Sequence, residues 1–157
     1  MTADETKVTA LSLAITQAEH SQTAGNWPNH NPGDIEDGSG AKIVYASDAD
    51  GMSALNGIVR GWLSGVSRIY SLDDNFYEVG RKYVNGPNAG LGPDSLAWSA
   101  NVVWWLNANA GTQLTGNNTL RDFLNYQAAV AAQPSYTVST VGSCPAGGCL
   151  GSCGGCC

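Results

Sequence analysis

The first carboxylate that could do chemistry is Glu19, which comes where an apolar helical pattern ends. The pattern covers residues 5–19, and its apolar positions are Val8, Leu11, Ile15 and Ala18. Glu19 follows Ile15 by four residues, so both fall on the same helix face. In the last turn of a helix, the dipole disfavours a negative charge by roughly a few tenths of a kcal/mol. Neither helix stability nor solubility accounts for an acid here.

Two interpretations of Glu19 follow from its position. A carboxyl group that faces a half-buried cleft has a raised pKa, which is what a general acid needs near neutral pH. Alternatively, Glu19 is an exposed side chain at a frayed helix end, the commoner environment of glutamate. The spacing alone leaves both open.

A turn-rich segment, residues 25–40, follows this helix. Trp27, together with Tyr45 just beyond the segment, offers flat faces for sugar rings. The polar side chains that could bind hydroxyl and amide groups are Asn29, His30 and Asn31. Loops longer than about 12 residues in compact domains are usually functional or disordered, and Trp27 with two prolines favours order. Alternatively, the prolines and glycine only make a turn and Trp27 belongs to the core.

The elements that must position these residues are mostly helical. Beyond residues 5–19, the pattern predicts a strand at 42–46 and helices at 48–63, 73–84, 94–108 and about 119–132. Ser71 and Asp74 resemble a capping box for the third helix, and Asp48 fits the N-terminus of the second. The fourth helix is expected to bury Leu96 and Leu106. We therefore expect a mainly α domain over residues 1–134, with one inserted loop and a short strand.

Composition excludes several classes of protein. The 157 residues suggest one domain, and 43% hydrophobic with 13% charged residues is a globular balance. The net charge is −6 and the seven Lys and Arg residues are scattered, which argues against nucleic-acid binding. We expect no membrane span and no signal peptide, because no apolar run approaches about 20 residues and the first residues are acidic. No metal or cofactor is expected, since residues 1–134 lack metal-ligand spacing.

The tail, residues 135–157, is rich in Ser, Gly and Cys. It holds all five cysteines: Cys144, Cys149, Cys153, Cys156 and Cys157. An odd number leaves one thiol after closed disulfides form, which suggests a bond to a neighbouring subunit. A tail with reactive free thiols is the plain alternative, and four-cysteine zinc binding is disfavoured by the crowded spacing.

The segments "AEHSQTAGNWPNHNPGDIE" and "YASDADGMSALNGIVRGWLSGVSRIYSLDDNFYEVGRKY" resemble the lysozyme-like domains of phage and prophage proteins, of lytic transglycosylase type. In that family a helix ends in Glu, an Asn-x-Pro-Gly turn follows, and aromatic helices come after it. The likeness covers residues 8–126. Three positions depart from the family pattern: His20 replaces a common Gly, while His30 and Asp34 each replace a common Asn.

The resemblance implies a small α-rich lysozyme-type fold that cuts the glycan strands of peptidoglycan. Glu19 would be the acid, and residues 29–35 would wall the cleft. Neutral Glu19 would protonate the glycosidic oxygen and form an oxocarbenium-like transition state. In a lytic transglycosylase Glu19 would then act as the base. A hydrolase would use a second carboxylate, Asp34 or Glu36, although either acid could simply serve a turn or the solvated surface.

Three functions remain open at this point. The first is a virion-associated or prophage-encoded enzyme that reaches the cell wall from the virion or after release from the host cytoplasm. The second is a non-catalytic structural protein of a virus particle, favoured by the departures at His20, His30 and Asp34 and by a tail that could bind other virion subunits. The third is a glycan-binding module that uses Trp27 and Tyr45.

Overall fold

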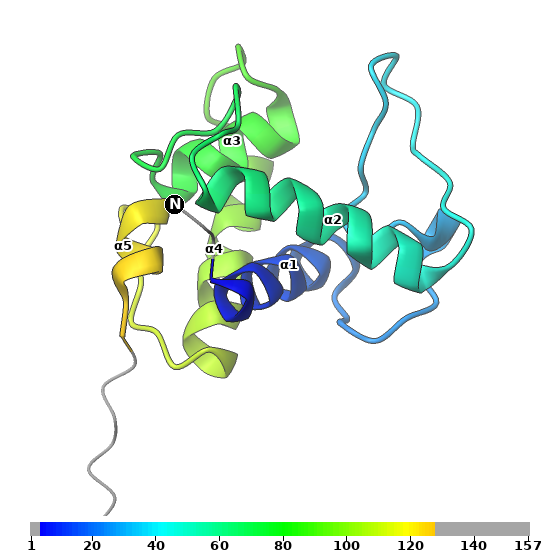
Figure 1. The fold of residues 1–157 in the computed structure, drawn as a ribbon. Helices are drawn as coiled ribbons and strands as arrows, with labels where there is room; N and C mark the ends of the chain where they lie inside the picture. Colours follow the sequence, from blue (N-terminus) through cyan, green and yellow to red (C-terminus); the bar gives the residue numbers. More distant parts are fainter. Residues whose placement is uncertain (1–3, 128–157) are drawn as a thin grey trace, which may run out of the picture.

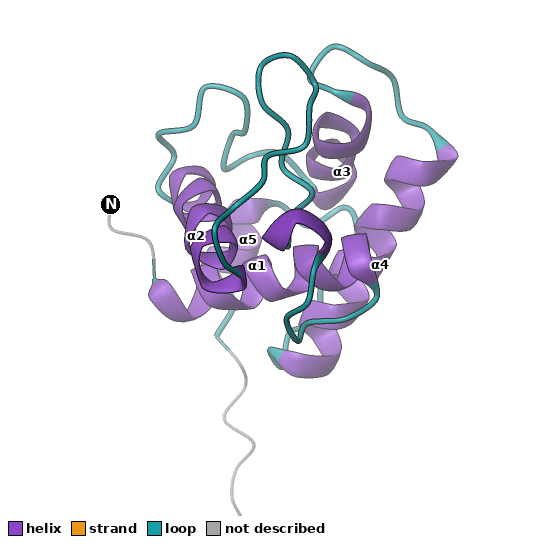
Figure 2. Cartoon of the chain, turned by 90° about the vertical axis from the view of Figure 1, so that its right-hand side faces the viewer, coloured by secondary structure: helices purple, strands orange, loops and turns teal. Residues whose placement is uncertain are grey.

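The computed structural model describes residues 4–127, and the helical expectation is confirmed there (Figure 1). The helices are α1 (Glu5–His20), α2 (Asp48–Leu63), α3 (Phe76–Asn85), α4 (Pro93–Asn109) and α5 (Leu120–Asn125), with a short 3-10 turn, η1 (Pro28–His30). No β-strand forms within these residues (Figure 2). The tail with its five cysteines and the predicted 134/135 boundary lie outside the described residues.

Side-chain caps set most helix starts. Asp4 accepts a hydrogen bond from the Thr6 amide at the start of α1, and Ser47 caps α2. Thr119 caps α5 through a capping box with Asp122. These polar side chains satisfy amides that have no partner inside a helix.

The predicted start of the third helix was wrong. The Ser71 amide does donate to Asp74, at 2.8 Å, but this closes a turn and not a helix. The main chain of Asp74 instead accepts from the Leu120 amide. The helix therefore begins only at Phe76, capped by Asn75. The local capping pattern was overridden by pairing with the chain that enters α5.

Of two other predicted elements, one does not form and one ends early. The segment 42–46 is not a strand, because its pairing is limited to an isolated bridge between Glu36 and Lys42. Helix α5 ends at Asn125, where Tyr126 becomes extended and its carbonyl accepts from Lys7 at 2.6 Å. Lys7 thus draws the chain out of the helix well before the predicted end.

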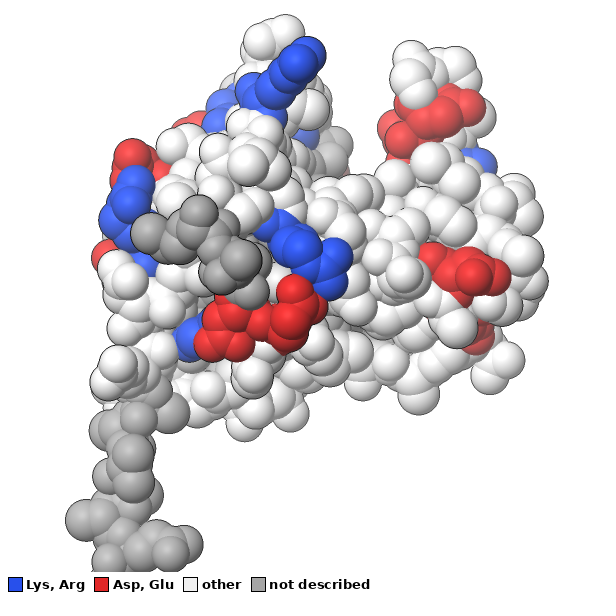
Figure 3. All heavy atoms as spheres, viewed as in Figure 1, with Lys and Arg blue, Asp and Glu red and all other residues white. Residues whose placement is uncertain are grey.

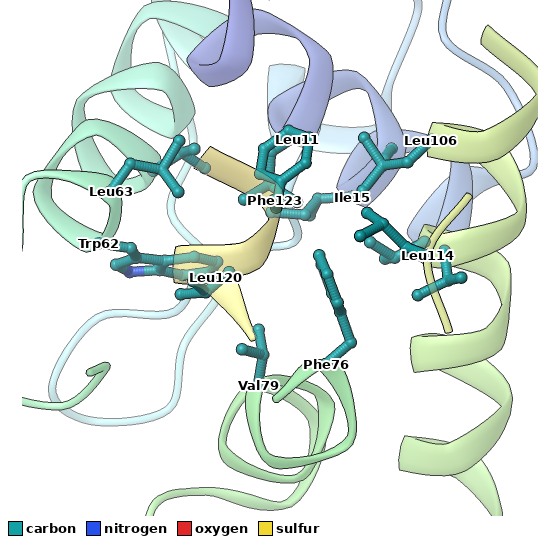
Figure 4. Close-up of a cluster of buried hydrophobic side chains, with 14 of the residues drawn as sticks. Leu11, Ile15, Trp62, Leu63, Phe76, Val79, Leu106, Leu114, Leu120 and Phe123 are labelled. Atoms are coloured by element: carbon teal, nitrogen blue, oxygen red, sulfur yellow. The ribbon is translucent and has the colours of Figure 1, made fainter. Parts of the chain in front are cut away.

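The core joins all five helices. Its fully buried members include Leu11 and Ile15 of α1, Leu63 of α2, Phe76 of α3, Leu106 of α4 and Phe123 of α5 (Figure 4). Phe76 and Phe123 meet edge to face, with centroids 6.3 Å apart. Each such side chain contributes roughly 1.5–3 kcal/mol through burial. This packing fixes the positions of the five helices relative to one another.

The first turns of helix α4 face inward differently than the pattern predicted, whereas Leu106 near its end is buried as expected. Leu96 is 42% exposed, whereas Ser95, Trp98 and Ser99 are buried with Leu106. The cause is Gly80 of α3, where an added Cβ would overlap the Ser99 hydroxyl and the Ser95 carbonyl. A glycine here lets the two helix backbones approach closely, so small serines occupy the contact and Trp98 is drawn inward.

The chain between α1 and α2, residues 21–47, contains the turn-rich segment and lies over the start of α2. Gly51 permits this contact, because a Cβ there would overlap the His30 carbonyl. From this part of the chain a narrow hairpin, residues 35–43, projects away from the helices (Figures 1 and 2). Within residues 4–127, no helix has the length and apolar character that a membrane span needs.

Candidate active site

A groove of about 630 Å³ opens between the hairpin and the helices. In Figure 3 the groove corresponds to the hollow beside the hairpin. The hairpin is the projection at the upper right that carries red Asp and Glu side chains. One wall is helical, with Glu19, Trp62, Tyr83 and Trp98. The other wall comes from the loop and carries Asp34, Glu36 and Lys42. With Asp94 from α4, the groove therefore gathers four carboxylates and a cation beside aromatic rings.

Glu19 stands in the last turn of α1, half-buried at the groove. Its Oε1 accepts a hydrogen bond from the Trp98 indole at 2.6 Å. Burial raises the pKa of Glu19, and the charge of Asp34 adds to this. The Trp98 hydrogen bond and the positive charges of His20 and Lys42 lower it. Burial is the largest cause, so this carboxyl group holds its proton to a higher pH than an exposed glutamate.

Aromatic rings form a continuous row along the groove. Trp98 stacks on Tyr83 with centroids 4.7 Å apart and an angle of 24°. Tyr83 meets the edge of Trp62 at 6.0 Å, and Trp62 stacks on Tyr70 at 4.1 Å. Burial and the charge of Glu19 keep the pKa of Tyr83 well above its usual value, so its hydroxyl stays a donor. That hydroxyl donates to the Gly33 carbonyl and so joins the helical wall to the loop.

Asn31 organises the loop wall from inside. Its side chain is fully buried, donates to the carbonyls of Ile35 (2.8 Å) and Ile43 (3.0 Å), and accepts from the Ile35 amide (2.8 Å). Its own carbonyl bonds to the His20 imidazole at 3.0 Å. Asn31 thus ties both arms of the hairpin to the end of α1, next to Glu19.

Lys42 pairs with the two carboxylates of the loop wall. Its Nζ lies 3.1 Å from Asp34 Oδ2 and 3.0 Å from Glu36 Oε1, and it also donates to the Asp34 carbonyl. The sequence had predicted that Asp34 and Glu36 could accompany Glu19, and both do line the same groove. Both acids of the loop wall therefore already have a partner in Lys42.

The residues predicted to bind sugar lie elsewhere. Trp27 is 7% exposed, and its indole N–H finds no partner among the described residues. Asn29 and His30 are exposed on a turn with positive φ at both residues, 57° and 52°. Asn31 is buried, and Tyr45 is half-buried with its amide donating to the Asn29 carbonyl. The structure places none of these five among the groove-lining residues.

Asp48 holds this turn against α2. One carboxylate oxygen accepts from the Asn26 amide at 2.6 Å, and the other lies 2.7 Å from His30 Nδ1. These hydrogen bonds, with a further one from the Trp27 amide, lower the pKa of Asp48. The acid that was expected only to start a helix therefore also anchors the loop wall.

The residues that the sequence interpretation missed are those of the aromatic row. Trp62, Tyr83 and Trp98 lie on apolar helix faces, so their pattern indicates core packing. Only the structure shows that these largely buried rings border one groove. Within residues 4–127 no group of His, Cys, Asp and Glu is arranged to hold a metal ion. The chemistry available here is proton transfer by Glu19 beside a surface of mixed apolar and polar character.

Comparison with known proteins adds no family. No protein-family model, no curated protein and no solved structure matches the chain. The lysozyme-like family therefore stays a prediction from the sequence, and the groove is the basis for any statement about function.

Proposed function

We propose that this domain is a peptidoglycan-cleaving glycosidase of the lytic transglycosylase or lysozyme type, with Glu19 as the general acid. The observation that carries the proposal is a half-buried carboxyl group with a raised pKa inside an aromatic groove. A group of this kind is protonated at a pH where exposed carboxylates are not, and can protonate a glycosidic oxygen. Such an enzyme would act on the cell wall from a virion or after release from a host.

The groove also has the mixed surface that a glycan strand requires. Tyr70 and the apolar side chains Ile58 and Ile69 lie on one side, while Asp34 and Lys42 stand on the other. A sugar ring has apolar faces and a polar rim, so it can pack on the first set and hydrogen-bond to the second. These residues replace Trp27 and Tyr45 as the candidates for contact with substrate.

Two endings of the reaction are possible after protonation. In the first, Glu19, now a carboxylate, removes the proton from the 6-hydroxyl of muramic acid, whose oxygen attacks the anomeric carbon and closes an anhydro ring. In the second, Asp34 or Glu36 activates a water molecule. The ion pairs of Lys42 with both acids favour the first ending, because Glu19 can serve as acid and base without them.

The test is digestion of purified peptidoglycan with products identified by mass spectrometry. The proteins compared are the wild type, Glu19→Gln and, as a matched control, Glu5→Gln, which changes an exposed acid at the other end of α1. We expect soluble products from the wild type and the control only. Anhydro-muropeptides mean transglycosylation, and reducing ends mean hydrolysis.

Other outcomes would contradict the proposal. No product from the folded wild type removes the enzyme and leaves a non-catalytic structural protein of a virus particle. Retained binding to insoluble peptidoglycan in that case would indicate a glycan-binding module. Equal product from wild type and Glu19→Gln would remove Glu19 as the acid.

A further inference from the structure

The hydrogen bond between Trp98 and Glu19 fixes one of the two carboxyl oxygens. Trp98 Nε1 lies 2.6 Å from Glu19 Oε1, and Trp98 is only 6% exposed. We propose that Trp98 is a positioning residue that assigns the acidic proton of Glu19 to the other oxygen, Oε2. The role in catalysis rests on the proposed function, whereas the placement of the proton does not.

The argument follows from what an indole can do. The indole N–H is a donor and has no acceptor, so the oxygen it meets must accept. The hydroxyl oxygen of a carboxylic acid is a much weaker acceptor than its carbonyl oxygen. A proton on Oε2 leaves Oε1 as the carbonyl acceptor that the short hydrogen bond needs. Neutral Glu19 therefore carries its proton on Oε2. Once that proton is given away, the same N–H donates to an anion, and hydrogen bonds to charged groups are stronger than neutral ones.

Trp98 can serve this purpose because it is held on both sides. Its ring stacks on Tyr83 at 4.7 Å, and the Tyr83 hydroxyl donates to the Gly33 carbonyl of the loop wall. Gly80 lies beneath, where an added Cβ would come within 3.2 Å of the Trp98 ring. A side chain fixed in this way keeps its N–H directed at Glu19 through the reaction. Preorganised donors of this kind need no rearrangement when charge develops.

Other charged groups face Glu19 but do not direct its proton in the same way. Asp34 raises its pKa through charge, and His20 and Lys42 lower it through charge. The hydrogen bond from Trp98 affects Glu19 more than any of these single charges does. Glu36 and Asp94 also line the groove. Trp98 is therefore the contact whose removal tests the proposal.

The first experiment needs no variant. With ¹⁵N-labelled tryptophan and ¹³C-labelled glutamate, NMR follows the Trp98 indole N–H and the Glu19 carboxyl carbon in the wild type across pH. We expect both signals to shift with one common midpoint, while the indole of Trp104, 61% exposed on the same helix, does not follow it. A Trp98 signal that is indifferent to the titration of Glu19 would overturn the proposal.

The second experiment compares Trp98→Phe with Trp104→Phe. Phenylalanine keeps a ring beside Tyr83 but removes the N–H, so the pKa of Glu19 should rise in Trp98→Phe and stay unchanged in the control. Turnover should fall about 10-fold to 100-fold with little change in KM, because the acid is misplaced and not the substrate. The alkaline limb of the rate profile should move to higher pH. An unchanged or lower Glu19 pKa in a folded Trp98→Phe protein would overturn the assignment.

The two proposals can fail separately. Coupled NMR signals in a protein that cleaves no peptidoglycan would support the role of Trp98 in placing the proton and remove the enzyme. Cleavage by a protein whose Trp98 signal does not follow Glu19 would support the enzyme and remove Trp98 as its positioning residue.

Discussion

The two walls of the groove are built by different kinds of interaction. The helical wall is held by packing. Tyr83 stacks on Trp98 and meets the edge of Trp62, and these rings continue into the core that joins all five helices. The loop wall is held by hydrogen bonds that converge on Asn31 and Asp48. Packing tolerates small shifts and spreads its free energy over many contacts, whereas a buried hydrogen bond is directional and costly to leave unmade. The walls should therefore respond differently to substitution.

The largest effect should come from the centre of the loop wall. Asn31→Ala removes three hydrogen bonds of about 1 kcal/mol each, so we expect the free energy of unfolding to fall by about 3 kcal/mol. Urea denaturation measures this loss. Asn88→Ala, in an exposed loop, is the control and should change little. A loss no larger than that of the control would mean that Asn31 does not hold the hairpin.

A smaller effect is expected where α3 crosses α4. Gly80→Ala forces a methyl group against Ser99 and the Ser95 carbonyl, which should cost about 1–3 kcal/mol. Gly57→Ala on α2 meets no atom within 4 Å and should stabilise the protein by about 0.5–1 kcal/mol. Thermal unfolding of the pair compares the two directly. If both substitutions changed the melting temperature in the same direction, the close helix contact beside Trp98 would be disproved.

The next effect concerns the response of the loop wall to acid. Asp48 has a lowered pKa in the folded protein, so its contribution is present above its ordinary pKa of 3.8 and is lost as pH falls through the lower folded value. The protection of the Asn26 amide from hydrogen exchange, measured relative to a free amide at the same pH, should fall in that range. In Asp48→Asn, that protection should already be lower at neutral pH and change little further in acid. Slow exchange in the variant would contradict the anchoring role.

The smallest effect on stability belongs to Lys42. Its ion pairs with Asp34 and Glu36 are exposed, so Lys42→Gln should change the free energy of unfolding by less than about 1 kcal/mol. The same substitution removes a positive charge that lowers the pKa of Glu19, so that pKa should rise. NMR titration of Glu19 measures it. A large loss of stability with an unchanged Glu19 pKa would mean that Lys42 supports the fold and does not act on Glu19.

The position of Glu19 was predictable from the sequence, whereas the aromatic row and the loop wall were not. The spacing of Leu11 and Ile15 placed Glu19 on the buried face of α1, because helix periodicity needs no tertiary information. The start of α3 could not be predicted in this way, since the pairing of Asp74 with Leu120 depends on chain that is distant in sequence. The same applies to Gly80, whose importance appears only when α4 lies against it.

Residue type was a poor guide to which side chains line the groove. Trp27 and Asn31 have side chains suited to binding sugar, yet one is buried and the other forms the turn. Tyr83 and Trp98 match an ordinary core pattern, yet they line the groove. The difference lies in the direction of the side chain, which in a loop with successive positive φ angles is set by long-range hydrogen bonds and not by local spacing.

The central claim is that Glu19 is a general acid whose pKa is raised by burial. The most direct measurement sets two curves for the wild type side by side: the NMR titration of the Glu19 carboxyl carbon and the pH dependence of kcat/KM on soluble glycan strands. We predict that activity declines as pH rises through the midpoint of Glu19, and that this midpoint lies above the ordinary value of 4.5. A Glu19 midpoint at or below that value would contradict the account. So would a kcat/KM that does not change as Glu19 titrates.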